Sequence, residues 1–165
     1  MDKDLVSIII ACYNGGPYID GCLLSLINLS YKNIEIIICD DASKDNSWEK
    51  LQAWEKKDSR IVLIRNQRNL FSANARNNCI AIAKGQYLMV QDIDDRSEPD
   101  RIDILLRSLK DNNVDFVSSS MITINNLGIE DRTKVLRHGV KFPSKYHFLW
   151  RLPFNHPATL FSKDS

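Results

Sequence analysis

Short runs of apolar residues, rich in isoleucine and valine, recur through the first two thirds of the chain. They show little alternation with polar residues, which is typical of strands buried on both faces of a parallel sheet. We expect strands at residues 5–11, 34–39, 61–64 and 87–90. Each run is followed by a segment of different periodicity, so the pattern predicts strands that alternate with helices.

The segments between these runs place apolar residues three and four positions apart, which is the spacing of an amphipathic helix. The expected helices begin near Pro17, Asn46, Ser72 and Pro99. Asn46 and Glu49 form a capping-box pattern, and Gly85 should end the third helix. The first, second and fourth helices should bury Ile19, Cys22, Leu23, Leu26 and Ile27, then Trp48, Leu51 and Trp54, and then Ile102, Leu105, Leu106 and Leu109.

This order of elements favours an α/β domain with a mostly parallel central sheet flanked by helices. Ligands of such domains bind at the carboxyl ends of the strands. Three of the expected strands are followed there by polar residues, which are Tyr13 and Asn14, Asp40 and Asp41, and Asp92, Asp94 and Asp95. After Asn112 the pattern changes to a longer strand at 114–124, a turn at 125–128 and a less regular aromatic tail.

Composition narrows the class of protein without identifying it. The 165 residues, 44% of them hydrophobic, suffice for one core, and a net charge of +1 offers no basic excess for binding nucleic acid. The apolar runs are too short to span a bilayer, and the N-terminus lacks the pattern of a signal peptide, so we expect a cytoplasmic location. The widely spaced cysteines, without a CxxC pair, predict buried thiols rather than a zinc site: Cys12, Cys22, Cys39 and Cys79.

The segment Asp92-Ile93-Asp94-Asp95 follows the fourth expected strand and is the strongest candidate for chemistry. Two carboxylates about 4 Å apart repel by about 4 kcal/mol at an effective dielectric of about 20. A divalent cation offsets this repulsion, and magnesium commonly takes one or two carboxylates together with water and substrate phosphates. The alternative is a solvated loop whose last aspartate caps the next helix.

Other polar residues at the same edge allow more than one interpretation. Asp41 could accept a hydrogen bond from a nucleobase N–H or could belong to an ordinary turn. Arg76 could bind phosphate or a base carbonyl, or could form a surface ion pair. The pair Gly15-Gly16 permits either close approach of the backbone to a ligand or a tight turn.

Taken together, these segments resemble the inverting glycosyltransferases of family 2, which have the GT-A fold. The resemblance is strong over residues 5–109 and returns at 155–161. The segments that carry it are Val6 to Gly15, Tyr31 to Ile38, Asp40 to Ser47, Arg65 to Leu70, Ala75-Arg76-Asn77, Ala83 to Tyr87, Asp92 to Asp95 with Pro99, and Asn155 to Phe161. The chain departs from the family pattern at Ala11-Cys12, and at Ala42 and Phe71, where glycine is frequent.

The resemblance implies a role for each matching residue. Tyr13 and Asn14 would contact the nucleoside, Asp41 the base edge, and Asp92 the ribose. Asp94 would be the principal ligand of Mg2+ or Mn2+, with Asp92 beside it, and Asp95 would lie next to the reacting sugar or cap the next helix. The implied nucleotide-binding set is Ala11, Tyr13, Asn14, Asp41, Arg76, Asp92 and Ile93.

The same resemblance predicts a transferase that moves a sugar from a nucleotide-diphosphate donor, expected to be a UDP-sugar, to a saccharide or lipid-linked acceptor. We expect residues 5–111 to form the nucleotide-binding half and 112–165 to begin the acceptor-side half of a single domain truncated at its C-terminus. The general base is expected beyond Ser165. A non-catalytic nucleotide-sugar-binding or interaction module is the alternative, and a nucleotidyltransferase is disfavoured because no phosphate-binding glycine-rich loop with lysine is present.

The aromatic and basic tail at 141–154 leaves two interpretations open. Lys141, Lys145 and Arg151 lie among aromatic residues, so the segment could form an acceptor wall or a peripheral contact with the inner face of the membrane. The favoured interpretation is core packing plus a face left bare by truncation. His156 is expected to be a structural turn residue.

Overall fold

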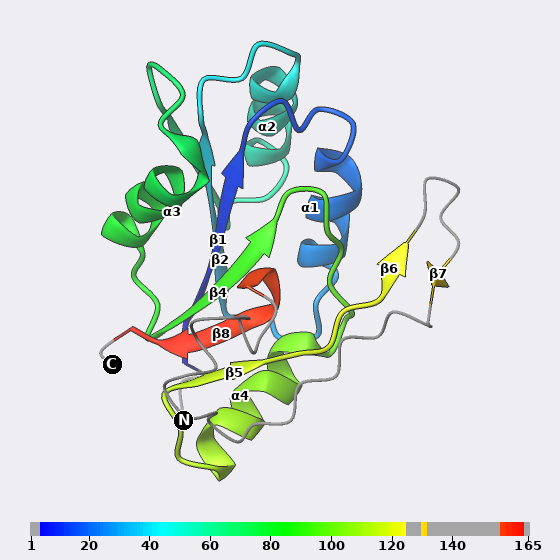
Figure 1. Cartoon of the computed structure of the whole chain (residues 1–165), viewed down its shortest axis with the longest axis vertical. Coiled ribbons are helices and arrows are strands. Elements are labelled where there is room, and N and C mark those ends of the chain that lie inside the picture. Colours follow the sequence, from blue (N-terminus) through cyan, green and yellow to red (C-terminus); the bar gives the residue numbers. More distant parts are fainter. Residues whose placement is uncertain (1–3, 125–129, 132–155, 164–165) are drawn as a thin grey trace, which may run out of the picture.

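The computed structural model describes residues 4–124, 130–131 and 156–163, which form a three-layer α/β arrangement (Figure 1). The helices are α1 (Ile19–Ile27), α2 (Ser47–Glu55), α3 (Phe71–Ile82) and α4 (Arg101–Asp111). The main sheet contains β1 (Val6–Cys12), β2 (Ile34–Asp40), β3 (Ile61–Arg65), β4 (Tyr87–Asp92), β5 (Phe116–Ser118) and β8 (Thr159–Ser162). A separate pair consists of β6 (Thr123–Ile124) and β7 (Glu130–Asp131), and η3 (His156–Ala158) precedes β8.

The six-stranded sheet has the order β3-β2-β1-β4-β8-β5. Its first four strands are parallel, whereas β8 runs antiparallel to both β4 and β5. From β1 the chain adds β2 and β3 on one side, and β4 then returns to pair with the other side of β1. The prediction of a mostly parallel sheet flanked by helices is therefore confirmed.

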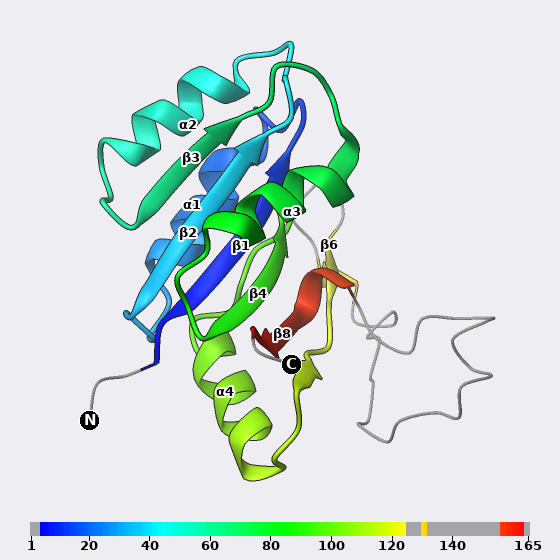
Figure 2. The same ribbon diagram turned by 90° about the vertical axis from the view of Figure 1, so that its left-hand side faces the viewer.

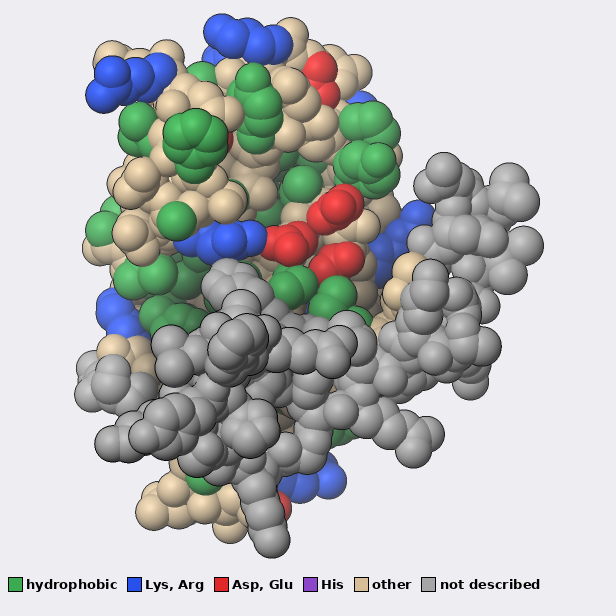
Figure 3. Space-filling view, in the orientation of Figure 1, with side chains coloured by type: hydrophobic (Ala, Val, Ile, Leu, Met, Phe, Trp, Pro, Cys, Tyr) green, Lys and Arg blue, Asp and Glu red, His purple; other side chains and the backbone are tan. Residues whose placement is uncertain are grey.

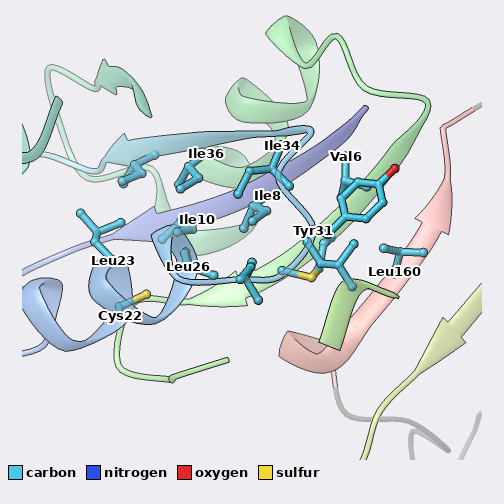
Figure 4. Close-up of a cluster of buried hydrophobic side chains, with 14 of the residues drawn as sticks. Val6, Ile8, Ile10, Cys22, Leu23, Leu26, Tyr31, Ile34, Ile36 and Leu160 are labelled. Atoms are coloured by element: carbon cyan, nitrogen blue, oxygen red, sulfur yellow. The ribbon is translucent and has the colours of Figure 1, made fainter. Parts of the chain in front are cut away.

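Helices cover both faces of the parallel strands (Figure 2). Side chains of β1 alternate between the faces, because Ile8 and Ile10 join the core under α1, α2 and α4, whereas Ile9 packs with Ala75 and Cys79 of α3. Figure 4 shows the larger of these clusters, with Leu23 and Leu26 of α1 turned toward the sheet. Burial on both faces explains why these strands have apolar runs instead of alternating patterns.

The predicted elements match the observed ones closely, with two corrections at helix ends. No side-chain cap hydrogen bond forms at Asn46, so the expected capping box with Glu49 is wrong. Asp45 takes that role, since its Oδ1 accepts hydrogen bonds from the backbone N and Oγ of Ser47 at 3.0 and 2.5 Å. Gly85 does not end α3 as expected, because that helix ends at Ile82 with Ala83 as its C-cap. Gly85 instead matters for packing, because a Cβ there would lie 2.6 Å from Ser7 Oγ.

Burial also agrees with the predicted stripes, except at Ile27 of α1, which is only partly buried, and on α2. Leu51 is fully buried, whereas Trp48 and Trp54 are only half-buried. The stripe of α4 is buried as expected, and all four cysteines are free, buried thiols. No described helix is long and apolar enough to cross a membrane.

The long strand expected at 114–124 is wrong, because two short strands occupy this region. The last residue of β5, Ser118, pairs with Thr159, which is the first residue of β8. The residues after Ser118 therefore have no further β8 residue with which to pair. The expected turn at 125–128 and the tail at 141–154 lie outside the described residues.

Candidate functional site

The carboxyl ends of β1, β2 and β4 lie side by side at one edge of the sheet. Cys12 is in register with Asp40, and Ala11 is in register with Asp92. Since β2 and β4 flank β1 on opposite sides, the strand order reverses at β1, and such a switch point is where open α/β sheets bind ligands. Acidic side chains with a basic one beside them are exposed over the end of β4 (Figure 3).

Asp92 forms an ion pair with Arg76 of α3, and both side chains are partly shielded from solvent. One guanidinium nitrogen of Arg76 contacts Oδ1 of Asp92, while Arg76 Nε is buried without a hydrogen-bond partner among the described residues. Of the interpretations open for Arg76, the structure shows an ion pair, but within the candidate site rather than on a remote surface. The pair leaves Oδ2 of Asp92 for another partner.

Asp95 is strained electrostatically by its surroundings. Burial raises its pKa to about 6, and repulsion from Asp92 and Asp94 adds to this effect, against a lowering influence of Arg101. The alternative in which Asp95 caps the next helix is wrong, because α4 begins at Arg101 and its N-cap position is Asp100. The loop thus holds more negative charge than its own cations neutralise, which suits a site for a divalent cation.

The residues expected to bind the metal fit a cation shared with a ligand. Asp94 is exposed beside Asp92, and the described residues contain no cluster of three or more potential metal ligands. A site of this kind matches Mg2+ or Mn2+ held by one or two carboxylates, with phosphate oxygens and water completing the coordination. It does not match an all-protein cage.

The loops after β1 and β2 brace each other. Asn14 N donates to Ser43 Oγ at 2.9 Å, and Lys44 N donates to Asn14 Oδ1 at 2.8 Å. Asn14 has a φ of 52°, a left-handed conformation that asparagine tolerates better than most residues. Tyr13 keeps 48% of its surface exposed, so its ring is available to a ligand.

Asp41 is 2% exposed and organises the connection between β3 and α3. Its Oδ1 accepts hydrogen bonds from Asn66 Nδ2 at 2.7 Å and from Leu70 N at 2.9 Å, and Oδ2 accepts the longer Leu70 bond of 3.1 Å. A carboxylate oxygen can accept more than one hydrogen bond, so Oδ2 retains capacity for a ligand N–H. The contact with Asn66 was missed from sequence, although polar residues directly after β3 were the signal for it.

Asp40 has a different environment from its neighbour. It is fully buried, and its Oδ2 lies 3.1 Å from Nε of Arg65, whose guanidinium also lies 4.9 Å from the ring centre of Trp48. The Asp40 carboxylate is therefore buried beside Arg65 without a hydrogen bond among the described residues, whereas the Asp41 carboxylate accepts hydrogen bonds from the β3–α3 connection. Two adjacent aspartates offered no local signal by which these separate functions could be assigned.

The glycine pair after Asn14 serves close packing within the protein. A Cβ on Gly15 would lie 3.0 Å from Cys12 Sγ, and one on Gly16 would lie 2.3 Å from Asn46 Oδ1. Tyr18 N also donates to the carbonyl of Gly15 at 2.8 Å, so Gly15 lies in a turn, whereas approach of a ligand to this backbone stays a prediction. In contrast, Ala42 and Phe71, which replace frequent glycines, have positive φ angles of 61° and 65°. Phe71 is also 78% exposed.

The geometry defines an α/β domain with an acidic candidate site at its topological switch point. The sequence model of the family described as Glycosyl transferase family 2 matches residues 7–161, so the chain belongs to that family. This membership agrees with the resemblance drawn from the sequence motifs.

Individual relatives agree with this assignment. The chain is 48% identical over 92 residues, 56% of its length, to Escherichia coli UDP-Glc:alpha-D-GlcNAc-diphosphoundecaprenol beta-1,3-glucosyltransferase WfaP, of which it covers 36%. It is 33% identical over 129 residues, 78% of its length, to the Escherichia coli enzyme of the same description named WfgD, of which it covers 50%. The chain thus spans half or less of the length of these relatives.

Solved structures show the same fold. S. aureus TarS 1–349 in complex with UDP-GlcNAc superimposes with a TM-score of 0.76 at 17% identity, covering 98% of this chain and 46% of that one. The mannosyltransferase PcManGT from Pyrobaculum calidifontis, in complex with GDP-Man and Mn2+, gives 0.71 at 20% identity, covering 96% and 44%. The expectation of a GT-A fold is confirmed.

Proposed function

We propose that this chain forms the nucleotide-sugar-binding part of a metal-dependent, inverting glycosyltransferase. The observation that carries the proposal is the acidic loop Asp92 to Asp95 at the switch point. Asp92 is paired with Arg76, Asp94 and Asp95 form no ion pair among the described residues, and burial with repulsion raises the pKa of Asp95 to about 6. A bound cation with a nucleoside diphosphate would remove this repulsion. Family membership supports the same reaction class.

The nucleoside would occupy the space between the loops after β1 and β2. The exposed ring of Tyr13 would stack on the base, and Asp41 Oδ2 would accept a base N–H. Ala11 and Ile93 would line the floor, where Ala11 lies in register with Asp92. Asn14 would act on the nucleoside mainly by holding Tyr13 and the loop at Ser43 in place, because both its backbone N and its Oδ1 are used there.

Asp92 and Arg76 would act as a unit beneath the ribose. Arg76 fixes one carboxylate oxygen of Asp92 and leaves the other for a ribose hydroxyl. Asp94, which is exposed and takes no part in this ion pair, would be the principal metal ligand. Mg2+ or Mn2+, when bound, would neutralise the charge that develops on the departing nucleoside diphosphate.

An acceptor hydroxyl would attack the anomeric carbon from the face opposite the departing diphosphate, which inverts the configuration. The protein would contribute orientation of the donor and stabilisation of the leaving group, both of which act on the transition state. We assign no general base among the described residues.

The donor and acceptor classes are proposed from the relatives. WfaP and WfgD are described as using UDP-Glc and a diphosphoundecaprenol-linked GlcNAc, and TarS was solved with UDP-GlcNAc. We therefore propose a UDP-sugar donor and a saccharide or lipid-linked acceptor. A lipid-linked acceptor would be met by a cytoplasmic protein with peripheral contact at the inner face of the membrane.

Calorimetric titration with UDP, in the presence of Mn2+ and in EDTA, tests the proposal. We expect Mn2+ to strengthen UDP binding by wild type. In Asp94→Ala the Mn2+-dependent increase in UDP affinity should be smaller by at least about 100-fold, because a principal ligand is removed. Glu98→Ala is the matched control, since Glu98 is an exposed carboxylate of the same loop. Equal Mn2+-dependent binding by wild type and Asp94→Ala would contradict the metal role.

A further inference from the structure

Arg101, the first residue of α4, lies behind the acidic loop and connects three separate segments. Its Nη1 donates to Gln91 Oε1 at 2.6 Å and to Ser97 Oγ at 2.8 Å. Its Nη2 donates to the carbonyl of Val90 at 3.3 Å and to that of Pro157 at 2.8 Å. One guanidinium thus contacts the end of β4, the far end of the acidic loop, and η3.

The acceptors of Arg101 are themselves buried and connected to the site. Gln91 is fully buried and Ser97 is 9% exposed, and Ser97 Oγ donates to Gln91 Oε1 at 2.9 Å. Gln91 Nε2 donates to the carbonyl of Asp92 at 3.1 Å, while Ser97 N donates to Ser25 Oγ of α1 at 3.0 Å. The network therefore holds both ends of the loop that carries Asp94.

The guanidinium of Arg101 is partly buried and donates only to neutral acceptors among its hydrogen-bond partners. None of the ion pairs among the described residues involves Arg101. Burial lowers the pKa of its guanidinium to about 10, and the negative charge of Asp95 acts against that lowering. Burying a guanidinium against neutral acceptors is costly, and apolar packing would fix an ordinary helix start at lower cost. A planar fork, however, can orient several acceptors at once, which a lysine cannot.

We propose that Arg101 is a positioning residue that sets the metal-binding geometry of the acidic loop by fixing both ends of that loop against η3. This role rests on the proposed function. Groups that orient metal ligands without touching the metal commonly contribute about 10- to 100-fold to metal affinity. Because Pro157 lies on the segment leading into β8, the same contact ties the donor site to a part of the chain remote in sequence.

The experiment measures the dissociation constant of UDP twice, in EDTA and with Mn2+, for wild type, Arg101→Met, Arg101→Lys and Ser97→Ala, together with thermal unfolding. Arg107→Met is the matched control, since Arg107 is an exposed arginine of the same helix. We expect Arg101→Met to reduce the Mn2+-dependent gain in affinity about 10- to 100-fold while UDP binding in EDTA changes little. Arg101→Lys should restore charge but only part of the gain.

Each outcome decides the inference. A purely structural role would lower the unfolding temperature and weaken UDP binding equally in EDTA and in Mn2+, and that result would overturn the proposal. Should Arg101→Met fail to fold, Ser97→Ala removes one acceptor and is expected to reduce the Mn2+-dependent gain by a smaller factor, whereas an unchanged gain would overturn it. A wild type without any Mn2+ effect would instead overturn the proposed function, and this role with it.

Discussion

The two edges of the parallel sheet surround partly buried carboxylates in opposite ways. At the amino edge, Glu35 of β2 accepts hydrogen bonds from Ser7 Oγ at 2.6 Å, from Lys84 N at 2.6 Å and from Gly85 N at 3.2 Å. At the carboxyl edge, Asp95 lies near two further carboxylates, and its pKa is raised to about 6 by burial and by their repulsion. At the amino edge the carboxylate is stabilised by hydrogen bonds from the protein, whereas at the carboxyl edge neighbouring carboxylates repel one another.

This difference separates stability from function. Glu35 provides acceptors for the backbone N–H groups between α3 and β4, so it holds the fold together without a ligand. Repulsion within the acidic loop is expected to lower the stability of the protein alone, and such local conflicts are typical of functional sites. The comparison can be tested by removing a carboxylate from each edge.

Glu35→Ala should have the largest effect on stability. The substitution leaves Lys84 N and Ser7 Oγ without their acceptor, whereas Gly85 N keeps its bond to Ser7 Oγ at 2.9 Å. The free energy of unfolding should therefore fall by about 2 kcal/mol. Denaturant unfolding measures this change. The control is Glu49→Ala on α2, which should change stability by less than about 0.5 kcal/mol because the expected capping box is absent.

A small effect of Glu35→Ala, or a loss of Mn2+-dependent UDP binding in a variant that still folds, would break the comparison between the edges. The amino edge would then not be purely structural.

The parts of this comparison that sequence could predict are those set by local pattern. Apolar runs identified the four parallel strands, and their order along the chain brought Asp41 and Asp92 to one edge because carboxyl ends of parallel strands align. The strand after α4 was overestimated, because its length depends on where β8 begins. The roles of Asp41 and Asp92 toward a ligand stay predictions, which the UDP titrations test.

Contacts between residues far apart in sequence could not be predicted. Arg101 binds the carbonyl of Pro157, and Glu35 accepts from Lys84, because the tertiary fold brings these groups together and neither segment alone encodes the pairing. Even the nearby cap on α2 was assigned to Asn46 instead of Asp45, since adjacent polar residues compete for one helix end. Side-chain networks therefore required the structure.

Asp95 predicts a smaller effect that depends on pH. Its pKa in the folded, metal-free protein is raised to about 6 from 3.8, so between these values the folded state binds more protons than the unfolded state. The free energy of unfolding should therefore fall as pH rises from 4 to 6, by about 1 kcal/mol after allowing for solvent screening of this partly exposed group.

Asp20, Asp45 and Asp58 have lowered pKa values, so they make stability rise with pH and would mask this trend. The measurement is therefore the difference between wild type and Asp95→Asn, in EDTA, across the pH range. We expect the free energy of unfolding of Asp95→Asn, relative to that of wild type, to increase as pH rises. A constant difference would show that the acidic loop is not electrostatically strained.

Substitution of Phe71 should have the smallest effect, and it should increase the stability of the protein. Its φ of 65° costs a side chain with a Cβ about 1 to 2 kcal/mol, and its 78% exposure means that little burial is lost on truncation. Glycine relieves the strain but adds entropy to the unfolded chain, so Phe71→Gly should stabilise by about 0.5 kcal/mol. Phe71→Ala is the control, because it removes the ring and keeps the strain. If both variants are stabilised equally, the exposed ring and not the backbone conformation is the unfavourable feature of Phe71. Repulsion among the carboxylates would then be the remaining source of strain at the carboxyl edge.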